Sequence, residues 1–298
     1  MSGLSLYTRG IIITALGVLI ISPDGLLTRL IHVDHWTLIF WRALFLSFGM
    51  WLISSLLYPN RTWQKYKSLG LAGMMMVLFY SMGTISFITA ITHTSVANTL
   101  IILSTTPLFA ALIGRMFLGE PIVARLWVAI LLVGIGVFVI SSDGENQNSS
   151  LFGDIAAMAG AFFLAAGFTM VRRFPRISIF PAISTAGMVT ALIVLPLAQP
   201  FSVTQNDMGY LLIMGVYMVP IGSALMFMGP KYIPAAEVGL MLLLESVLGP
   251  TWVWLALGEQ PGLRTFIGGA IILTTLAVNT IWAMQSSRRT RQTALATG

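Results

Sequence analysis

Long apolar runs, separated by short polar connections, dominate this sequence. Ten of the runs reach the length of about 20 residues that an α-helix needs to cross the hydrocarbon core of a bilayer. These runs are residues 9–31, 36–58, 69–91, 95–117, 123–141, 151–172, 178–198, 208–229, 234–255 and 261–284. The pattern therefore predicts an all-α integral membrane protein with ten transmembrane helices.

A short repeat indicates how the ten helices are organised. The tripeptide Leu118-Gly119-Glu120 recurs as Leu257-Gly258-Glu259. Five predicted spans separate the two copies, and an odd number of crossings places the copies on opposite faces of the membrane. Halves of opposite topology are typical of secondary transporters. With the polar segment 142–150 as the joint, we predict an inverted five-plus-five repeat formed by residues 1–146 and 147–298.

Composition excludes several classes of protein. Of the 298 residues, 57% are hydrophobic and only 9% are charged, whereas about 25% of an ordinary soluble domain is charged. A soluble globule could not bury so much apolar surface, so we expect lipid to surround most of the chain. The chain has no Cys and carries no catalytic, phosphate-binding or dinucleotide motif. We therefore expect no metal site, no cofactor and no enzymatic activity.

The positive charges predict the orientation of the helices. If the N-terminus lies in the cytoplasm, all of the 16 Lys and Arg residues except Arg29, Arg42 and Arg264 fall on the cytoplasmic side. Because such residues concentrate in the cytoplasmic connections of membrane proteins, both termini are predicted to be cytoplasmic. The formal net charge is +6, but the basic residues are scattered between apolar runs and form no domain that would bind nucleic acid.

Several motifs together resemble one known family. They are Ser95-Val96-Ala97-Asn98, Ser104-Thr105-Thr106-Pro107-Leu108-Phe109, the first Leu-Gly-Glu copy, Gly134-Ile135-Gly136-Val137 and Phe40-Trp41-Arg42. The set is similar to the EamA domain of the drug/metabolite transporter superfamily, and the likeness covers nearly the whole chain as two halves. Over its full length the chain looks most similar to the YddG-type aromatic amino acid exporters. The resemblance implies export of small metabolites across a bacterial inner membrane, through a central cavity between the halves.

Charged residues inside the predicted spans are candidates for function, because burying a charge in lipid is costly. Asp24 and Arg42 lie at similar depths in the first and second spans, so their side chains could pair across adjacent antiparallel helices. Such a pair could be a gate latch, a proton-sensitive pair or a static bridge, and we favour the static bridge. Glu245, near the middle of the ninth span, could carry a proton, engage a substrate ammonium group or hydrogen-bond to neighbouring helices.

One face of the third span combines aromatic and small residues. Tyr80, Gly83 and Phe87 fall on this face, and Phe79 lies beside Tyr80 in the same span. Rings beside exposed backbone could stack a flat apolar substrate. The alternative is plain helix–helix packing, for which membrane proteins commonly use small residues.

Polar residues and prolines in two other spans are further candidates. Asn98 and Thr105 share a face of the fourth span ahead of Pro107, and Tyr217 lies near Pro220 in the eighth span. Proline removes a backbone hydrogen bond, and helices broken at mid-depth often mark the site of a transporter. Simple kinks that fit the bundle would give the same pattern.

These inferences predict a secondary transporter that exports amino acids with apolar or aromatic side chains by alternating access. The expected substrate contacts are Phe79, Tyr80, Gly83, Asn98, Thr105, Tyr217 and Glu245, and the expected gating or coupling residues are Asp24, Arg42, Pro107 and Pro220. The expected partners are a small-molecule substrate, the lipid bilayer and, as a candidate coupling ion, the proton, for a monomer or homodimer. Alternative cargoes are a nucleotide precursor, a polyamine or a cationic drug, and the alternative class is a membrane-embedded enzyme.

Overall fold

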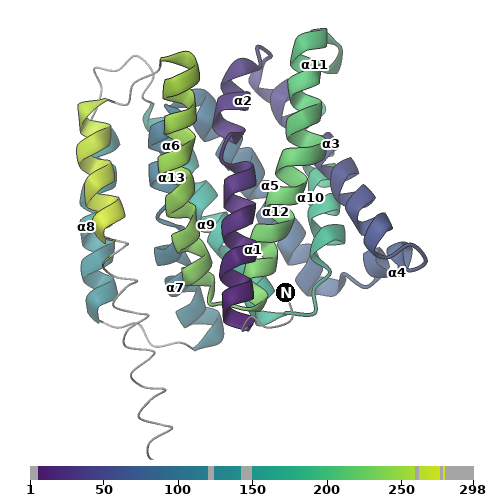
Figure 1. Ribbon diagram of the computed structural model, residues 1–298, viewed down its shortest axis with the longest axis horizontal. Coiled ribbons are helices and arrows are strands. Elements are labelled where there is room, and N and C mark those ends of the chain that lie inside the picture. The colour runs from purple at the N-terminus through teal and green to yellow at the C-terminus, as the bar shows by residue number, and fades with distance from the viewer. Residues whose placement is uncertain (1–5, 120–123, 142–149, 259–261, 276–277, 279–298) are drawn as a thin grey trace, which may run out of the picture.

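The computed structural model describes residues 6–119, 124–141, 150–258, 262–275 and 278, and these residues form helices and no strand. In Figure 1 the helices stand side by side as one bundle. The helices of the first half are α1 (Leu6–Ile21), α2 (Asp24–Leu30), α3 (His35–Leu57), α4 (Thr62–Lys67), α5 (Gly70–His93), α6 (Val96–Leu103), α7 (Thr106–Leu118) and α8 (Ala124–Ser141). Those of the second half are α9 (Leu151–Arg173), α10 (Ile179–Val194), η1 (Pro200–Ser202), α11 (Gln205–Leu212), η2 (Ile213–Met218), α12 (Val219–Met228), η3 (Gly229–Lys231), α13 (Ala235–Leu257) and a last helix, Leu263–Thr275.

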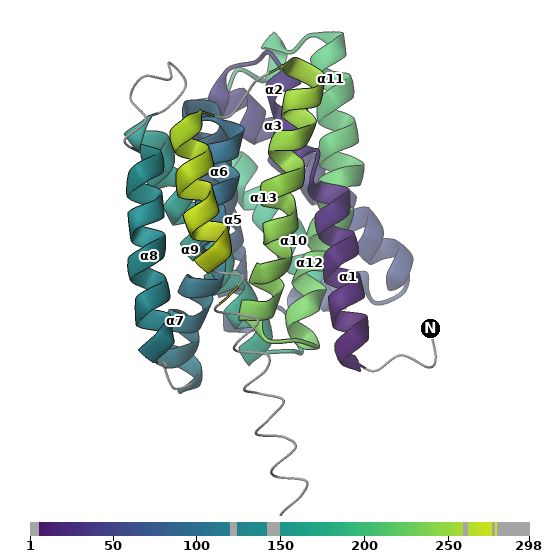
Figure 2. The same ribbon diagram turned by 60° about the vertical axis from the view of Figure 1, so that its left-hand side comes forward.

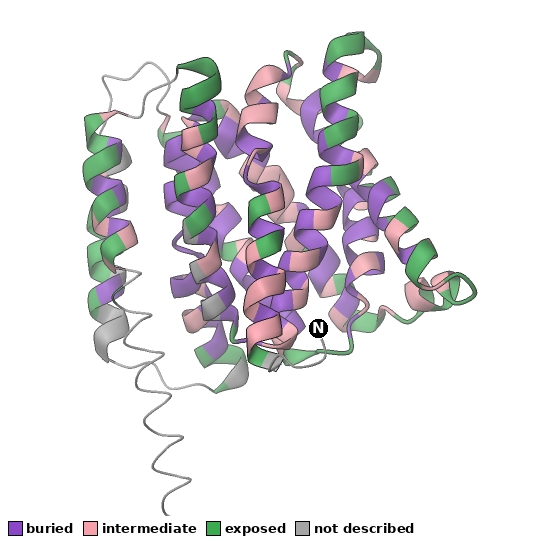
Figure 3. Ribbon diagram, viewed as in Figure 1, coloured by how far each residue is buried: buried purple, intermediate pink, exposed green. Residues whose placement is uncertain are grey.

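Within the described residues, six helical segments are long and apolar enough to cross a membrane. They are Tyr7–Leu30, His35–Leu57, Gly70–His93, Val96–Phe117, Leu151–Arg173 and Gln205–Lys231. Two shorter apolar helices, Ile179–Val194 and Leu263–Thr275, accompany them. Apolar side chains are exposed on the outer faces of the bundle while its centre is buried, as expected of a surface that faces lipid (Figure 3). The chain is therefore a multi-pass membrane protein, as predicted, and the count of ten crossings stays a prediction.

The helix contacts follow the order that two inverted halves require. The helices of the first predicted half pack against those of the second in matching pairs: α5 with α9, and α1 with α12. Likewise α3 packs against α10, and α6 and α7 pack against α13. If each helix is replaced by its counterpart in the other predicted half, the pair of α5 and α9 becomes the pair of α12 and α1. The other pairs stay the same. The predicted boundary at residues 146 and 147 lies outside the described residues and stays a prediction.

The two Leu-Gly-Glu copies end equivalent helices. Gly119 follows α7 with φ of 69°, and Gly258 follows α13 with φ of 70°. Glycine adopts this left-handed conformation without a steric penalty, and it is the usual residue just after a helix. The two helix ends lie at opposite ends of the bundle, as the predicted inversion requires (Figures 1 and 2). Glu120 and Glu259, which complete the two copies, lie outside the described residues.

Three of the long segments depart from a regular α-helix part of the way along their length. The first segment breaks between α1 and α2, where Pro23 cannot donate a backbone hydrogen bond. The fourth breaks between α6 and α7, where Pro107 lies in the first turn of α7, so the predicted interruption is confirmed. Pro220 lies at the start of α12, directly after the π-helical η2. Pro250 lies inside α13, and the helix continues through it, as transmembrane helices can when neighbouring groups satisfy the freed carbonyl.

Candidate functional site

A cavity lies at the centre of the bundle, where helices of the two predicted halves meet. It has about 640 Å³ of empty volume and is mostly apolar. Its lining residues are Ile21, Asp24, Arg42, Phe79, Tyr80, Gly83, Thr84, Phe87, Leu103, Gly160, Phe163, Leu164, Val219, Ser223, Met226, Phe227 and Glu245. A mostly apolar hollow with a few convergent polar groups is the usual form of a small-molecule site.

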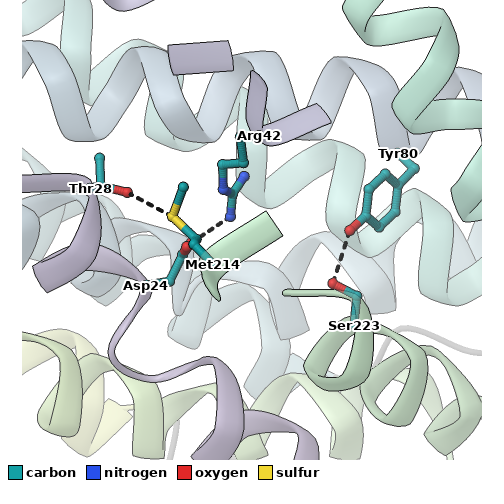
Figure 4. A network of polar contacts seen from close by, with 6 residues as sticks. All are labelled: Asp24, Thr28, Arg42, Tyr80, Met214 and Ser223. Carbon is teal, nitrogen blue, oxygen red and sulfur yellow. Dashed lines mark hydrogen bonds and ion pairs between the residues drawn. The ribbon is translucent and has the colours of Figure 1, made fainter. Parts of the chain in front are cut away.

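A buried ion pair forms one wall of this cavity. Arg42 on α3 donates from Nη2 to Oδ2 of Asp24, at 2.5 Å, and both side chains are at most 5% exposed (Figure 4). Asp24 opens the short helix α2 directly after the break at Pro23, which places its carboxylate beside α3. The predicted pairing of these two residues is confirmed.

The ion pair leaves hydrogen-bonding capacity unused. Oδ1 of Asp24 and Nε of Arg42 are buried and have no hydrogen-bond partner among the described residues. The guanidinium also lies 5.5 Å from the centre of the Phe87 ring, a distance at which a cation–π interaction operates. Because a buried polar atom without a partner is unfavourable, these two atoms leave part of the desolvation cost of the ion pair uncompensated.

Glu245 brings a second carboxylate to the same cavity. It lies on α13, is 5% exposed and forms no hydrogen bond or ion pair with the described part of the chain. It is close enough to interact electrostatically with both Asp24 and Arg42. The cavity thus holds one more carboxylate than guanidinium, and it can attract a group of positive charge.

Aromatic side chains of α5 form the opposite wall. Tyr80, Gly83 and Phe87, which share the predicted helix face, all line the cavity, and Phe79 lines it as well. The hydroxyl groups of Tyr80 and Ser223 lie 2.9 Å apart and join α5 to α12 by a hydrogen bond (Figure 4). The Tyr80 ring also packs on Phe227, with 5.4 Å between ring centres. This wall therefore combines aromatic rings with a hydrogen bond that joins the two predicted halves.

Two of the proposed substrate contacts are buried elsewhere. The carbonyl oxygen of the Asn98 side chain accepts a hydrogen bond from Thr265 at 2.7 Å, so Asn98 ties α6 to the last helix. Thr105 is buried at the break between α6 and α7, where its hydroxyl has no partner among the described residues. Neither residue lines the central cavity.

Tyr217 and the two prolines also lie outside the cavity lining. The Tyr217 side chain is 65% exposed, so its predicted contact with substrate in this cavity is wrong. The π-helical turn of η2 changes the direction in which the side chains after it point, relative to those of α11. The residue spacing of a regular α-helix therefore does not predict which way Tyr217 faces. The Pro107 ring packs against Gly239 of α13, and the Pro220 ring against Gly49 of α3.

Several cavity residues were not selected from the sequence. Gly160, Phe163 and Leu164 share one face of α9, and Ser223 and Phe227 share one face of α12. Their i, i+3 and i+4 spacing is the available signal. It did not single them out because the lipid-facing sides of these helices are equally apolar. The described residues include no cluster of three or more His, Asp or Glu side chains that could hold a metal ion.

Comparison with known proteins agrees with the two-part arrangement. The EamA-like transporter family matches residues 8–142 and again residues 151–281. An uncharacterized transporter of Methanothermobacter thermautotrophicus is 25% identical over 63% of this chain and 57% of its own length. The pseudopaline exporter CntI of Pseudomonas aeruginosa is 25% identical over 62% of this chain and 66% of its own length. The chain thus spans less than two thirds of the length of these curated relatives.

A solved structure shares the fold. This protein crystal structure aligns over 94% of the present chain and 98% of its own, with a TM-score of 0.69 at 17% identity. The likeness in sequence extends over both halves of the chain. The chain therefore belongs to the EamA-like transporter family.

Proposed function

We propose that this transporter exports amino acids with apolar or aromatic side chains across the bacterial inner membrane. The observation that carries the proposal is the position of Glu245, a buried carboxylate with no hydrogen-bond partner among the described residues, in an aromatic cavity that also contains Arg42. A zwitterion presents an ammonium group and a carboxylate, and Glu245 and Arg42 have the charges that complement them. The rings of Phe79 and Tyr80 suit the apolar side chain of the substrate.

The proposed mechanism is alternating access around this cavity. The hydrogen bond between Tyr80 and Ser223 joins α5 and α12, which belong to opposite predicted halves. The helix breaks at Pro23 and Pro107 lie in segments that contribute Asp24 and Leu103 to the lining. Rocking of one half against the other would open the cavity to each side in turn. Ten crossings with both termini in the cytoplasm complete the proposed topology.

A cationic cargo is the second candidate. Among the described residues that line the cavity, Asp24 and Glu245 supply two carboxylates and Arg42 supplies one guanidinium. A polyamine or a cationic drug would balance this excess negative charge without needing a carboxylate of its own. A nucleotide precursor would depend on the aromatic wall rather than on Glu245.

The test is a flux assay with purified protein in liposomes. We expect labelled phenylalanine to move down its gradient, and a polyamine, a quaternary ammonium dye and a nucleoside to move more slowly. Faster movement of either cation would favour the second candidate, and movement of none of the four would contradict transport of these cargoes. Empty liposomes and an unrelated membrane protein serve as controls.

The same liposomes test whether protons are a partner. In the described lining of the cavity, Glu245 and Asp24 are the carboxylates, and Arg42 and Tyr80 are the other titratable groups. If a proton and the substrate ammonium compete for Glu245, acidifying the side to which phenylalanine moves should accelerate its movement. A flux that is unchanged by a pH gradient of either direction would remove both carboxylates as proton carriers.

A further inference from the structure

A second hollow lies on the outside of the bundle, between α3, α10 and the segment formed by α11 and η2. It has about 1250 Å³ of empty volume. Its lining residues are Leu44, Phe45, Ser47, Phe48, Trp51, Tyr66, Ser184, Thr185, Met188, Leu212 and Val216. None of these residues lines the central cavity. We call this hollow the lateral groove.

The open sides of the lateral groove are apolar. Phe48 is 51% exposed, Trp51 is 47% exposed, and their rings stack with 5.9 Å between centres. Met188 and Leu212 on the facing helices are similarly exposed. An exposed apolar hollow within a predicted membrane span is in contact with acyl chains, because no water is available there to fill it.

One end of the lateral groove is polar. Tyr66 of the short helix α4 donates a hydrogen bond to Ser184 at 2.8 Å, and Ser184 donates to the backbone oxygen of Ser47 at 2.9 Å. These bonds join α4, α10 and α3, so the groove ends beneath α4. Figure 1 shows α4 beside the ends of α3 and α10, on the side of the bundle where the N-terminus lies.

Positive charge collects at this polar end. Lys65 and Lys67 flank Tyr66 on α4, and their ammonium groups lie 5.3 Å from the Tyr58 ring and 5.8 Å from the Trp63 ring. Lys231, at the end of η3, is close enough to Lys65 for the two charges to repel each other. No carboxylate is paired with Lys65 or Lys67 in the described part of the chain. An anion at this end would relieve the repulsion.

We propose that the lateral groove binds one anionic phospholipid, with an acyl chain between α3, α10 and η2 and the headgroup on Lys65 and Lys67. The apolar walls match the acyl chain of such a lipid, and the basic end matches its anionic headgroup. In a bilayer the headgroup likewise lies at the surface and the acyl chain lies below it. The basic end lies on the predicted cytoplasmic side, where anionic lipids attract Lys and Arg. The lipid would contact η2, the irregular turn that leads into the cavity helix α12.

The experiment is native mass spectrometry of the purified protein after exchange into an equimolar mixture of phosphatidylglycerol and phosphatidylcholine. Wild-type protein should retain one phosphatidylglycerol in preference to phosphatidylcholine. Neutralising the headgroup site in Lys65→Gln/Lys67→Gln should lower that preference by about 5-fold for each lysine. Arg172→Gln/Arg173→Gln is the matched control, because it removes two adjacent basic residues at the end of α9, away from the groove.

A second variant tests the acyl-chain part of the site. Met188→Trp fills the groove from an exposed position and should reduce retention of both lipids, with Leu212→Trp as the replacement if the first variant unfolds. Thermal unfolding without added lipid checks that each variant is folded. Equal retention of the two lipids by wild-type protein would overturn the proposal. Unchanged preference in the double lysine variant, or unchanged retention in a folded groove-filling variant, would overturn it as well.

Discussion

Replacing Glu245 by Gln is expected to lower phenylalanine transport by about 10- to 100-fold. The change keeps the shape of the side chain but removes the charge proposed to bind the substrate ammonium group. A hydrogen bond to a charged group contributes about 1.5–3 kcal/mol, which corresponds to that range. The rate of labelled phenylalanine efflux from liposomes, at matched protein content, measures the effect.

Two controls separate a local effect of Glu245 from a general loss of negative charge. Asp207→Asn neutralises a carboxylate that accepts a hydrogen bond from His32 and lies outside the cavity lining, and it should leave transport unchanged. The deaminated analogue 3-phenylpropionate should be a poor substrate of both wild-type protein and Glu245→Gln. If Glu245→Gln transports phenylalanine at the wild-type rate, Glu245 does not bind the ammonium group.

Breaking the ion pair between Asp24 and Arg42 is expected to have the largest effect on stability. Asp24→Asn leaves the Arg42 guanidinium buried and without its counter-charge, at a cost of about 3–5 kcal/mol. The corresponding readout is a lower midpoint of thermal unfolding in detergent. A midpoint equal to that of wild-type protein would show that Arg42 finds another partner or reaches water.

Removing both charges distinguishes a structural bridge from a working part of the site. Because an apolar pair of similar volume can replace a buried ion pair, Asp24→Leu/Arg42→Met should recover most of the stability lost in Asp24→Asn. If Arg42 binds the substrate carboxylate, this double variant should still fail to transport phenylalanine. Recovery of both stability and transport would identify the pair as the static bridge that the sequence favoured.

The sequence predicts those parts of the site that depend on the spacing of residues within a helix or on their depth in the membrane. Tyr80 and Gly83 had to share a face because an α-helix repeats every 3.6 residues, and both line the cavity. Asp24 and Arg42 could be paired because equal depth in adjacent spans brings two charges together, and lipid leaves them no other partner. The two-part organisation followed from the repeated tripeptide. The inversion of the halves, which rests on the odd number of apolar runs between its copies, stays a prediction.

The rotation of each helix about its own axis could not be predicted in the same way. In a membrane protein the lipid-facing side and the packed side are both apolar, so hydrophobicity does not distinguish them. Tyr217 was therefore placed in the site although it faces outward, and Phe163 was not selected although it lines the cavity. The partner of Asn98 is Thr265 on a distant helix, and no local pattern specifies that contact.

The central claim is that the cavity between α5, α9, α12 and α13 is the route of transport, and counterflow of labelled phenylalanine tests it most directly. Gly83 lines the cavity, where a Cβ atom would lie 3.5 Å from Cβ of Phe163, so Gly83→Ala fits while Gly83→Phe takes up cavity space. Gly134 on α8 is exposed with open space around it, so Gly134→Phe is the matched control. We predict that Gly83→Phe abolishes counterflow, whereas Gly83→Ala and Gly134→Phe retain it and all three keep the unfolding midpoint of wild-type protein. Counterflow at the wild-type rate by a folded Gly83→Phe variant would contradict the claim.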